Sequence, residues 1–318
     1  MRAIRISEWG GPEVLELVDD APTPEPGPGE LLVHVNRAGV NFADTHARDN
    51  SYLAPYALPL TPGAEVAGTT EDGRRVVGMT MSGGYAEYAA VPAAATFPIP
   101  DGVSDGAALA LLVQGLTAWH LYRTAAKLAE GESVVVHAAA GGVGSLAVQL
   151  GRAFGAGRVI ATASTPEKRE LALELGAHVA VDVTREDLKD ALIEANEGRR
   201  VDVVLEMAGG AVFDASLRAL APFGRLVTYG QASRDGNQVQ VTNLLRHSSA
   251  VIGFWLVHCL VKPREMLTEP LQDLFARVAS GDLRVVEGPV YPLSDVRRAH
   301  EDLQARRTVG KLVLDPAS

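Results

Sequence analysis

The 318-residue sequence contains a single cysteine, Cys259. One thiol excludes a disulfide framework within one chain, and it excludes any zinc or iron–sulfur site held by several cysteines. A chain without disulfides suits a reducing compartment, so we expect a cytoplasmic location. We interpret Cys259 as a small buried hydrophobe, because side chains of adjacent residues such as His258 and Cys259 rarely face each other.

Long apolar runs are also missing. The longest, residues 250–261, covers about twelve positions and includes His258, whereas a membrane span needs about twenty. The first eight residues alternate charged and apolar side chains and so lack the apolar core of a signal peptide. We therefore expect neither a membrane span nor an export signal.

The sequence has fewer basic than acidic residues. Lys and Arg number 29 against 39 Asp and Glu, which gives a net charge of −10. This balance argues against nucleic acid or an anionic membrane as a partner, although it leaves room for a local basic patch. The length suggests about two domains, and the 47% of hydrophobic residues provide for a sizeable core.

The pattern of predicted elements changes along the chain. The first hundred residues carry short β-forming runs separated by glycine-containing turns, which predict a small barrel or sandwich. From residue 133 to 229, apolar strands alternate with helices. This alternation predicts a doubly wound parallel sheet covered on both faces. The tail after residue 250 is too small to stand alone, and we expect it to pack on the N-terminal β domain.

The most informative stretch is residues 137–145, HAAAGGVGS, which follows a predicted strand and opens a predicted helix. Gly141 and Gly142 permit a tight turn and the close approach of a pyrophosphate, and Gly144 lets the helix pack against the strand. The helix N-terminus adds N–H donors and a partial positive charge. The stretch predicts a dinucleotide site. The alternative is a tight turn that binds nothing.

The next strand end separates NAD from NADP. About twenty residues beyond the glycines, NAD-binding chains often carry an acid for the ribose 2′-hydroxyl. Here the position is Ser164, followed by Lys168 and Arg169. A serine can donate to a 2′-phosphate and either cation can neutralise it, which favours NADP. The nearby Asp182 weakens this preference without reversing it. Alternatively, the two cations are solvated helix residues.

Several further segments carry a family resemblance along essentially the whole chain: AGVNFAD at 38–44, PGAEVAG at 62–68, GLTA at 115–118 and GKLVL at 310–314. With the glycine turn, they resemble the medium-chain dehydrogenase/reductase superfamily, in its zinc-independent quinone oxidoreductase (zeta-crystallin-like) branch. The resemblance implies an α/β fold that combines a Rossmann doubly wound parallel sheet with a β-rich GroES-like catalytic domain. The implied domains are GroES-like over 1–116, Rossmann over 117–252, and a return segment over 253–318 that completes the catalytic domain.

Zinc alcohol dehydrogenases also resemble the chain, but their ligands are missing. Where that branch has Gly-His-Glu, this sequence reads Gly63-Ala64-Glu65, and no cysteine lies near residues 39–41. A substitute cluster of His46 and Glu65 would still fall short of the three protein ligands typical of a catalytic site. We therefore predict no metal. Without a Lewis acid, an electron-poor quinone or conjugated enone is a better hydride acceptor than an alcohol is a donor.

The resemblance also implies residue roles. Asn41 and Tyr52 are the predicted catalytic residues, which line the substrate cleft. The alternatives are an asparagine that closes a local turn and a tyrosine that packs. Arg307 is an alternative to Arg306 as the arginine near the cofactor. The predicted cofactor-binding residues are Asn41, Thr117, Gly141, Gly142, Val143, Gly144, Ser164, Lys168, Gly230, Phe254, Trp255 and Arg306.

These inferences predict an NADPH-dependent, zinc-independent oxidoreductase that transfers hydride to a small quinone or activated alkene. One alternative is an enoyl-thioester or 2-alkenal reductase, which uses the same hydride chemistry in a different pocket. Another is a non-catalytic NADPH- or RNA-binding protein, against which the negative net charge counts. Because relatives often pair their Rossmann sheets edge to edge, we expect a homodimer.

Overall fold

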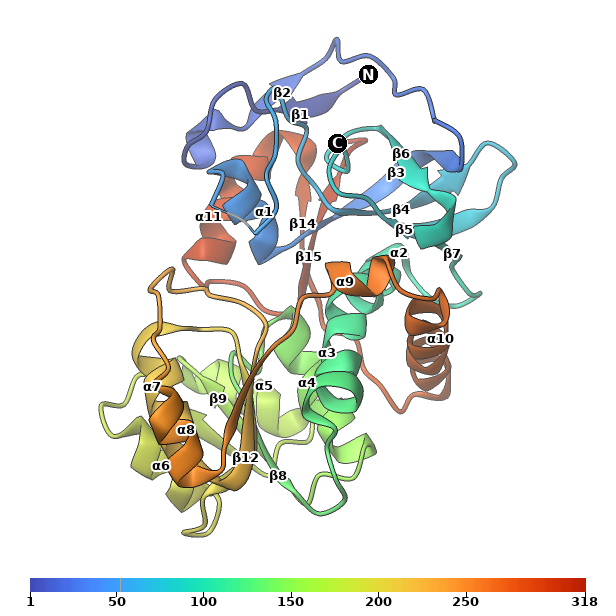
Figure 1. Ribbon diagram of the computed structural model, residues 1–318. Helices are drawn as coiled ribbons and strands as arrows, with labels where there is room; N and C mark the ends of the chain where they lie inside the picture. Colours follow the sequence, from blue (N-terminus) through green and yellow to red (C-terminus); the bar gives the residue numbers. More distant parts are fainter. Residues whose placement is uncertain (52) are drawn as a thin grey trace. The chain divides into compact units, whose positions relative to one another are not determined.

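The computed structural model describes residues 1–51 and 53–318 (Figure 1). The chain forms two compact units. Unit 1 consists of Met1–Gln114 and Leu271–Ser318, and unit 2 of Gly115–Pro270. In this part of the chain, no helix has the length and hydropathy that a bilayer span requires.

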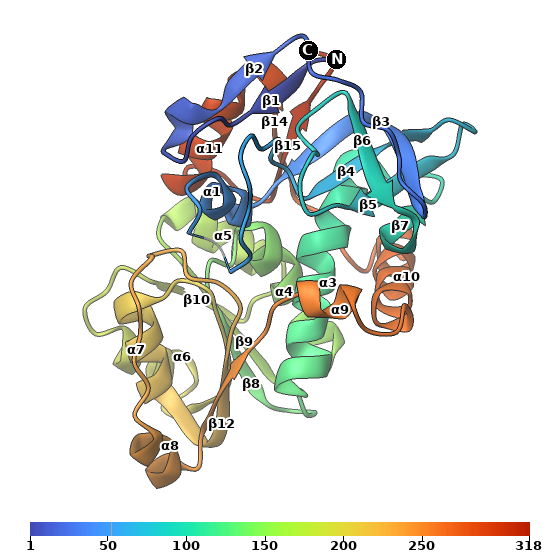
Figure 2. The ribbon, with the colours of Figure 1, turned by 45° about the horizontal axis from the view of Figure 1, so that its top comes forward.

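Unit 1 is built on a mainly antiparallel sheet with the strand order β14-β15-β3-β4-β5-β7, in which β6 also pairs with β3 (Figure 2). Its strands are β1 (Ala3–Arg5), β2 (Glu16–Val18), β3 (Glu30–Val40), β4 (Glu65–Thr70), β5 (Arg75–Met79), β6 (Tyr88–Pro92), β7 (Thr96–Pro98), β14 (Glu287–Pro292) and β15 (Lys311–Asp315). Its helices and helical turns are η1 (Pro12–Val14), α1 (Phe42–Arg48), η2 (Ala93–Ala95), α2 (Asp105–Leu109), η5 (Leu293–Asp295) and α11 (Val296–Gln304).

Strand β3 organises unit 1. It pairs antiparallel with β4, β6 and β15, so it touches both the N-terminal and the C-terminal segment of the unit. Val33, Val35 and Leu312 from these strands are buried in one hydrophobic cluster. Burial of the apolar side chains of this cluster favours folding of the unit. The C-terminal segment thus returns to the N-terminal sheet.

Unit 2 holds a parallel sheet with the order β10-β9-β8-β11-β12-β13. Right-handed crossovers place α4 and α5 on one face and α6 and α7 on the other (Figure 1). Its strands are β8 (Ser133–Val136), β9 (Arg158–Ala163), β10 (Val179–Asp182), β11 (Val201–Glu206), β12 (Leu220–Thr228) and β13 (Ala250–Gly253). Its helices are α3 (Leu116–His120), η4 (Leu121–Ala126), α4 (Gly142–Ala153), α5 (Pro166–Glu174), α6 (Leu188–Ala195), α7 (Gly210–Ala219), α8 (Val241–His247) and α9 (Val257–Leu260).

The chain passes between the units inside two helical segments. The first is the π-helical η3 (Ala110–Gly115), and the second is α10 (Glu265–Ser280), which contains Pro270. By contact, the return segment begins at Leu271, whereas the resemblance implied a start at residue 253. Residues 253–270 stay with unit 2 because β13 is the last strand of its sheet and α9 follows it directly.

The predicted α/β class is confirmed, with a Rossmann-type parallel sheet and a separate strand-rich unit. Strand β13 ends at Gly253, and strand β14 begins at Glu287. Cys259 is 3% exposed, as expected for a buried thiol.

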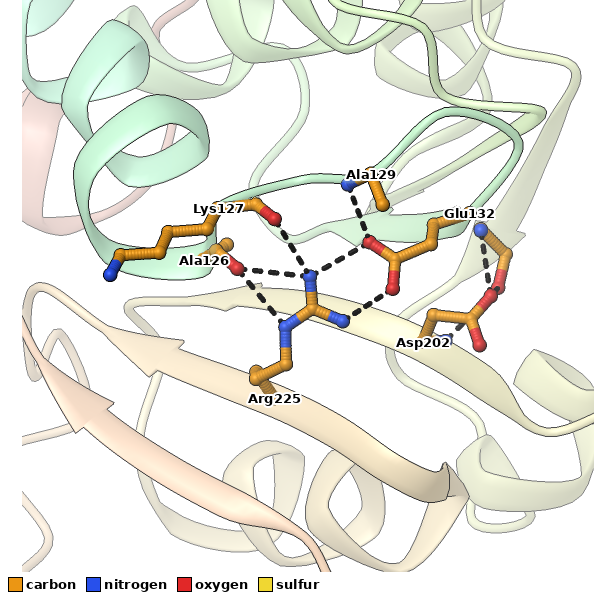
Figure 3. A network of polar contacts seen from close by, with 7 residues as sticks. Ala126, Lys127, Ala129, Glu132, Asp202 and Arg225 are labelled. Carbon is orange, nitrogen blue, oxygen red and sulfur yellow. Dashed lines mark hydrogen bonds and ion pairs between the residues drawn. The ribbon is translucent and has the colours of Figure 1, made fainter.

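A polar network ties the start of the parallel sheet to the helix before it (Figure 3). Arg225 on β12 donates through Nε and Nη2 to the carbonyl oxygen of Ala126 at 3.0 and 2.9 Å. Its guanidinium also forms a two-pronged ion pair with Glu132. Because Ala126 ends η4, the arginine satisfies a carbonyl that the helix leaves unpaired.

Candidate cofactor and substrate site

The glycine turn of unit 2 lies between β8 and α4. At Gly144 the turn leaves no space for a side chain. A Cβ atom on Gly144 would lie 2.8 Å from Cα of Ala139 and equally close to the carbonyl carbon of Ala138. Both neighbours are backbone atoms that cannot swing aside. Ala138 itself adopts a positive φ of 50° to start the turn. Gly144 therefore allows α4 to begin directly against the end of β8, as the sequence predicts.

The first turn of α4 presents backbone N–H groups outward. The first intrahelical bond runs from the Ser145 N–H to the Gly141 carbonyl oxygen at 2.9 Å. The N–H groups of Gly142, Val143 and Gly144 precede it and have no acceptor within the helix. Together with the helix dipole, such donors favour an anion at this end of α4.

The other predicted cofactor residues of unit 2 lie along one edge of the sheet. Ser164 follows β9, Gly230 follows β12 and Phe254 follows β13, and the strands are parallel, so these residues share the carboxyl edge with the glycine turn. The Phe254 ring stacks on His120 of α3 at a centroid distance of 5.8 Å, which brings α3, with Thr117, to the same edge.

One of the two cations predicted near Ser164 is paired with an acidic side chain. Arg169 forms an ion pair with Asp182, Nη1 to Oδ2, at 3.1 Å. Hydrogen bonds from the Thr184 N–H and hydroxyl, with a smaller contribution from Arg169, lower the pKa of Asp182. The pair neutralises the acid that weakened the NADP prediction, and it also commits Arg169. Lys168, in the first turn of α5, is the other cation that the sequence predicted for a 2′-phosphate.

One acidic residue at this edge escaped the sequence analysis. Glu206, the last residue of β11, is fully buried, and its Oε1 accepts from the N–H groups of Ala208 and Gly209 at 2.7 and 2.8 Å. Burial raises the pKa of Glu206 above its ordinary value. The carboxylate thereby shapes the loop after β11. The signal in the sequence that could have identified Glu206 is an acidic residue at the end of an apolar strand.

Asn41 in unit 1 occupies the junction between β3 and α1. It is the N-cap of α1, and its N–H donates to Oδ2 of Asp44 at 2.8 Å. Asn41 therefore does close a local turn, which was the alternative role suggested by the sequence. The side chain is also engaged: Nδ2 donates to Oε1 of Glu65 at 2.7 Å, and Oδ1 accepts from Nζ of Lys311 at 3.0 Å.

A second buried network holds the backbone at Asn41. The Tyr85 hydroxyl donates to Asp44 Oδ2 at 2.9 Å and lies 3.2 Å from Nε2 of His300, whose Nδ1 contacts Arg48. Burial raises the pKa of Asp44 to about 6. Burial, with a smaller effect of the Arg48 charge, lowers the pKa of His300 to about 3. A neutral His300 accepts from Arg48 and donates to Tyr85, so the network fixes one tautomer.

The residues at the zinc-ligand position do not fit a metal. Oε1 of Glu65 is bound by the Lys311 ammonium and by the Asn41 amide. His46 contacts the Ser51 hydroxyl at 2.9 Å instead of joining Glu65. Across residues 1–51 and 53–318, no group of three His, Cys, Asp or Glu side chains is close enough to hold an ion. Catalytic zinc needs about three protein ligands.

The remaining predicted residues are placed as follows. Tyr52 lies outside the described residues. Arg306 follows α11 in unit 1 with a positive φ of 57°, whereas Trp255 lies in unit 2 with its ring against His258. Arg307, the alternative to Arg306, pairs with Asp302 at 2.7 Å. Lys311 was missed as a site residue, although a lysine inside the apolar strand KLVL was its signal.

Comparisons with known proteins agree with this architecture. The family model of a zinc-binding dehydrogenase matches residues 142–276, and that of an alcohol dehydrogenase GroES-like domain matches residues 27–101. A quinone oxidoreductase of Pseudomonas aeruginosa is 35% identical over 99% of each chain. A mycobacterial protein solved in complex with NADPH is 38% identical with a TM-score of 0.94, covering 99% of this chain and 100% of its own.

The quinone oxidoreductase of Escherichia coli, also solved in complex with NADPH, is 33% identical with a TM-score of 0.91 and covers 99% of this chain and 100% of its own. The similarity therefore extends through both units. Together with the Rossmann sheet and the strand-rich unit, these matches show that the chain belongs to the medium-chain dehydrogenase/reductase superfamily, in its quinone oxidoreductase branch.

Proposed function

We propose that the chain is an NADPH-dependent oxidoreductase that transfers hydride to a quinone or an activated alkene and works without zinc. The observation that carries the proposal is the glycine turn, where Gly144 lets α4 start against β8 and aims backbone donors outward. Two relatives similar over the whole chain were solved with NADPH. The cradle fits the diphosphate of such a cofactor.

Each end of the cofactor has candidate partners. The diphosphate would lie on Gly141, Gly142, Val143 and Gly144, and the 2′-phosphate near Ser164 and Lys168. Thr117, Gly230, Phe254 and Trp255 of unit 2 and Asn41 and Arg306 of unit 1 are proposed for the remainder. When bound, NADPH supplies the hydride, so that a quinone gains two electrons and, with one proton from solvent, becomes a hydroquinone while NADP⁺ is formed.

The protein contributes binding, orientation and exclusion of water, which together can lower a barrier by several kcal/mol. Asn41, and Tyr52 by resemblance, are the residues proposed to line the substrate cleft. No metal is needed to polarise an acceptor that is already electron-poor. The Lys311 ammonium on Glu65 supports this zinc-independence.

Stopped-flow mixing of the NADPH-loaded enzyme with a panel of quinones and enones tests the proposal. We expect NADPH absorbance to decay faster with an acceptor than without one, and elemental analysis to find substoichiometric zinc. NADPH binding without oxidation by any acceptor would instead identify a non-catalytic binding protein. Faster turnover on acyl thioesters or 2-alkenals than on quinones would move the assignment to that reductase class.

We propose a homodimer in the cytoplasm acting on a small molecule. Support for pairing comes from β13, which is an edge strand of the parallel sheet and whose residues are partly buried or exposed. Light scattering coupled to gel filtration tests this, and a monomer at micromolar concentration would contradict it.

A further inference from the structure

The Asn41 amide is gripped from both sides by buried side chains, which we call the Asn41 cluster: Asn41, Glu65, Gln114 and Lys311. None of the four is more than 9% exposed. Oδ1 of Asn41 accepts from Lys311 Nζ at 3.0 Å and from Gln114 Nε2 at 3.4 Å. Nδ2 donates to Glu65 Oε1 at 2.7 Å, and Lys311 also pairs with Glu65.

Chemistry alone fixes the orientation of this amide. An ammonium can only donate and a carboxylate can only accept. Turning the amide over would place its NH₂ group against Lys311 and its oxygen against Glu65, so both contacts would become repulsive. The pair therefore holds Asn41 in one orientation, and in a buried site the preference is strong.

This orientation limits what Asn41 can offer to a ligand. The lone pairs of Oδ1 are taken by Lys311 and Gln114. Nδ2 carries two hydrogens, and Glu65 uses one of them. The second hydrogen meets no acceptor in residues 1–51 and 53–318. Toward a ligand, the side chain can donate a hydrogen bond but cannot accept one.

The cluster is also costly, which favours a role beyond stability. Oε2 of Glu65 and Oε1 of Gln114 are buried without a hydrogen-bond partner among the described residues. Each such oxygen carries a desolvation penalty, and apolar side chains of similar size often replace a buried ion pair without loss. Gly39 makes space for the arrangement, because a Cβ there would lie 2.6 Å from Cγ of Glu65.

We propose that Lys311 and Glu65 are positioning residues that restrict Asn41 to donation, so that the site selects acceptors with a carbonyl oxygen conjugated to the reduced bond. This inference rests on the proposed function and specifies its substrate class. As hydride arrives, the carbonyl oxygen gains negative charge, and a donor placed there stabilises the transition state. Asn41 keeps its own proton, and the product oxygen takes its proton from solvent.

A double-mutant cycle separates positioning from simple structural support. The variants are Asn41→Leu, the pair-neutralising Lys311→Met/Glu65→Gln, and all three changes together. Neutralising both partners avoids an unpaired buried charge. We expect about a tenfold loss of kcat on quinones for Asn41→Leu and for the neutralised pair, with the KM for NADPH within about twofold of wild type. In the Asn41→Leu background, neutralising the pair should cost less than about twofold.

The matched control is Lys189→Met/Asp190→Asn, which removes an exposed ion pair of unit 2 and should leave kcat unchanged. Equal losses from the neutralised pair with and without Asn41 would show a purely structural role and overturn the proposal, as would wild-type kcat in Asn41→Leu. Failure of the proposed function would appear earlier, as wild-type enzyme that reduces no acceptor.

If the neutralised pair does not fold, the wild-type enzyme still provides a test. In ¹⁵N-edited spectra, the Asn41 side-chain NH₂ signals are assigned by their loss in Asn41→Leu. Rotation about an amide C–N bond is slow, so Asn41 gives two proton resonances, and the hydrogen bond to Glu65 should place one of them downfield. We expect only the other resonance to shift when a hydroquinone product is added. A product that moves neither resonance, or only the Glu65-bonded one, would contradict the inference.

Discussion

Gly144 shows how one missing Cβ can decide whether a binding turn forms. Its nearest neighbours are backbone atoms of Ala138 and Ala139, which cannot yield as a flexible side chain would. The proposed roles of Lys168 and Asn41 also depend on local contacts, namely the charge of one side chain and the hydrogen bonds of the other. Substitutions at these positions therefore test the site directly.

Gly144→Ala should push α4 away from β8 and disturb the anion site. We expect NADPH to bind at least about tenfold more weakly, together with a stability loss of about 1–3 kcal/mol from overpacking. The matched control is Gly236→Ala, because a Cβ at that position meets nothing within 4 Å. Isothermal titration with NADPH checks both variants. Equal affinities would place the diphosphate elsewhere.

Lys168→Ala tests the 2′-phosphate contact. Loss of one cation should weaken NADPH binding by about fivefold to tenfold and leave NADH binding nearly unchanged, because only NADPH carries the extra charge. The preference should also decline as salt is raised. Fluorescence titration with both cofactors, beside Lys189→Ala as a surface-charge control, measures the difference. Equal weakening for both cofactors would argue against the assignment.

At the scale of elements, the sequence predicted the strands, which follow from the pattern of apolar residues. It missed the features that depend on contacts between residues far apart in the chain. The apolar runs at 75–79, 158–163 and 201–206 form strands β5, β9 and β11, and all but one residue of each strand are buried. The short helix α1 was not predicted, since seven residues carry little periodicity and its start depends on the Asp44 contact. Likewise, no pattern near Asn41 could reveal Lys311, which lies 270 positions away.

The Arg225 network tests how a helix end is secured to the sheet (Figure 3). Arg225→Met removes the bonds to Ala126 and leaves the partly buried Glu132 without its cation. We expect the free energy of unfolding to fall by about 2 kcal/mol, with part of it regained in Arg225→Met/Glu132→Gln. Urea unfolding of both variants measures this. A double variant less stable than the single one would contradict the account.

At the scale of the whole molecule, two buried histidines set an acid limit on stability. In unit 2, Nε2 of His137 lies 2.7 Å from the Ser216 hydroxyl, which donates to Val212, so His137 is the donor in that contact. Its Nδ1, 2.8 Å from the Thr162 hydroxyl, is then the acceptor. Burial lowers the pKa of His137 to about 4, so this neutral form persists in the folded chain. His300 plays the same part in unit 1.

Acidification should therefore destabilise the protein. Below about pH 6.5 the unfolded chain protonates these histidines while the folded chain does not, so unfolding takes up protons and stability falls. His137 alone should account for about 2 kcal/mol between pH 6.5 and 5. Asp44 opposes the trend, because its raised pKa makes the folded chain bind a proton below about pH 6. Urea unfolding of wild type and His137→Gln across this range tests the sign, and a pH-independent difference between them would refute it.

The discontinuity of unit 1 has a consequence for synthesis. Unit 2 is one uninterrupted stretch and can assemble as soon as residue 270 has emerged from the ribosome, whereas β3 must wait for β15. Glu65 is thus made early and receives its ammonium only when Lys311 arrives. A nascent chain that stalls before that residue leaves the Glu65 carboxylate in the sheet without its ammonium, and an uncompensated buried charge destabilises the unfinished unit.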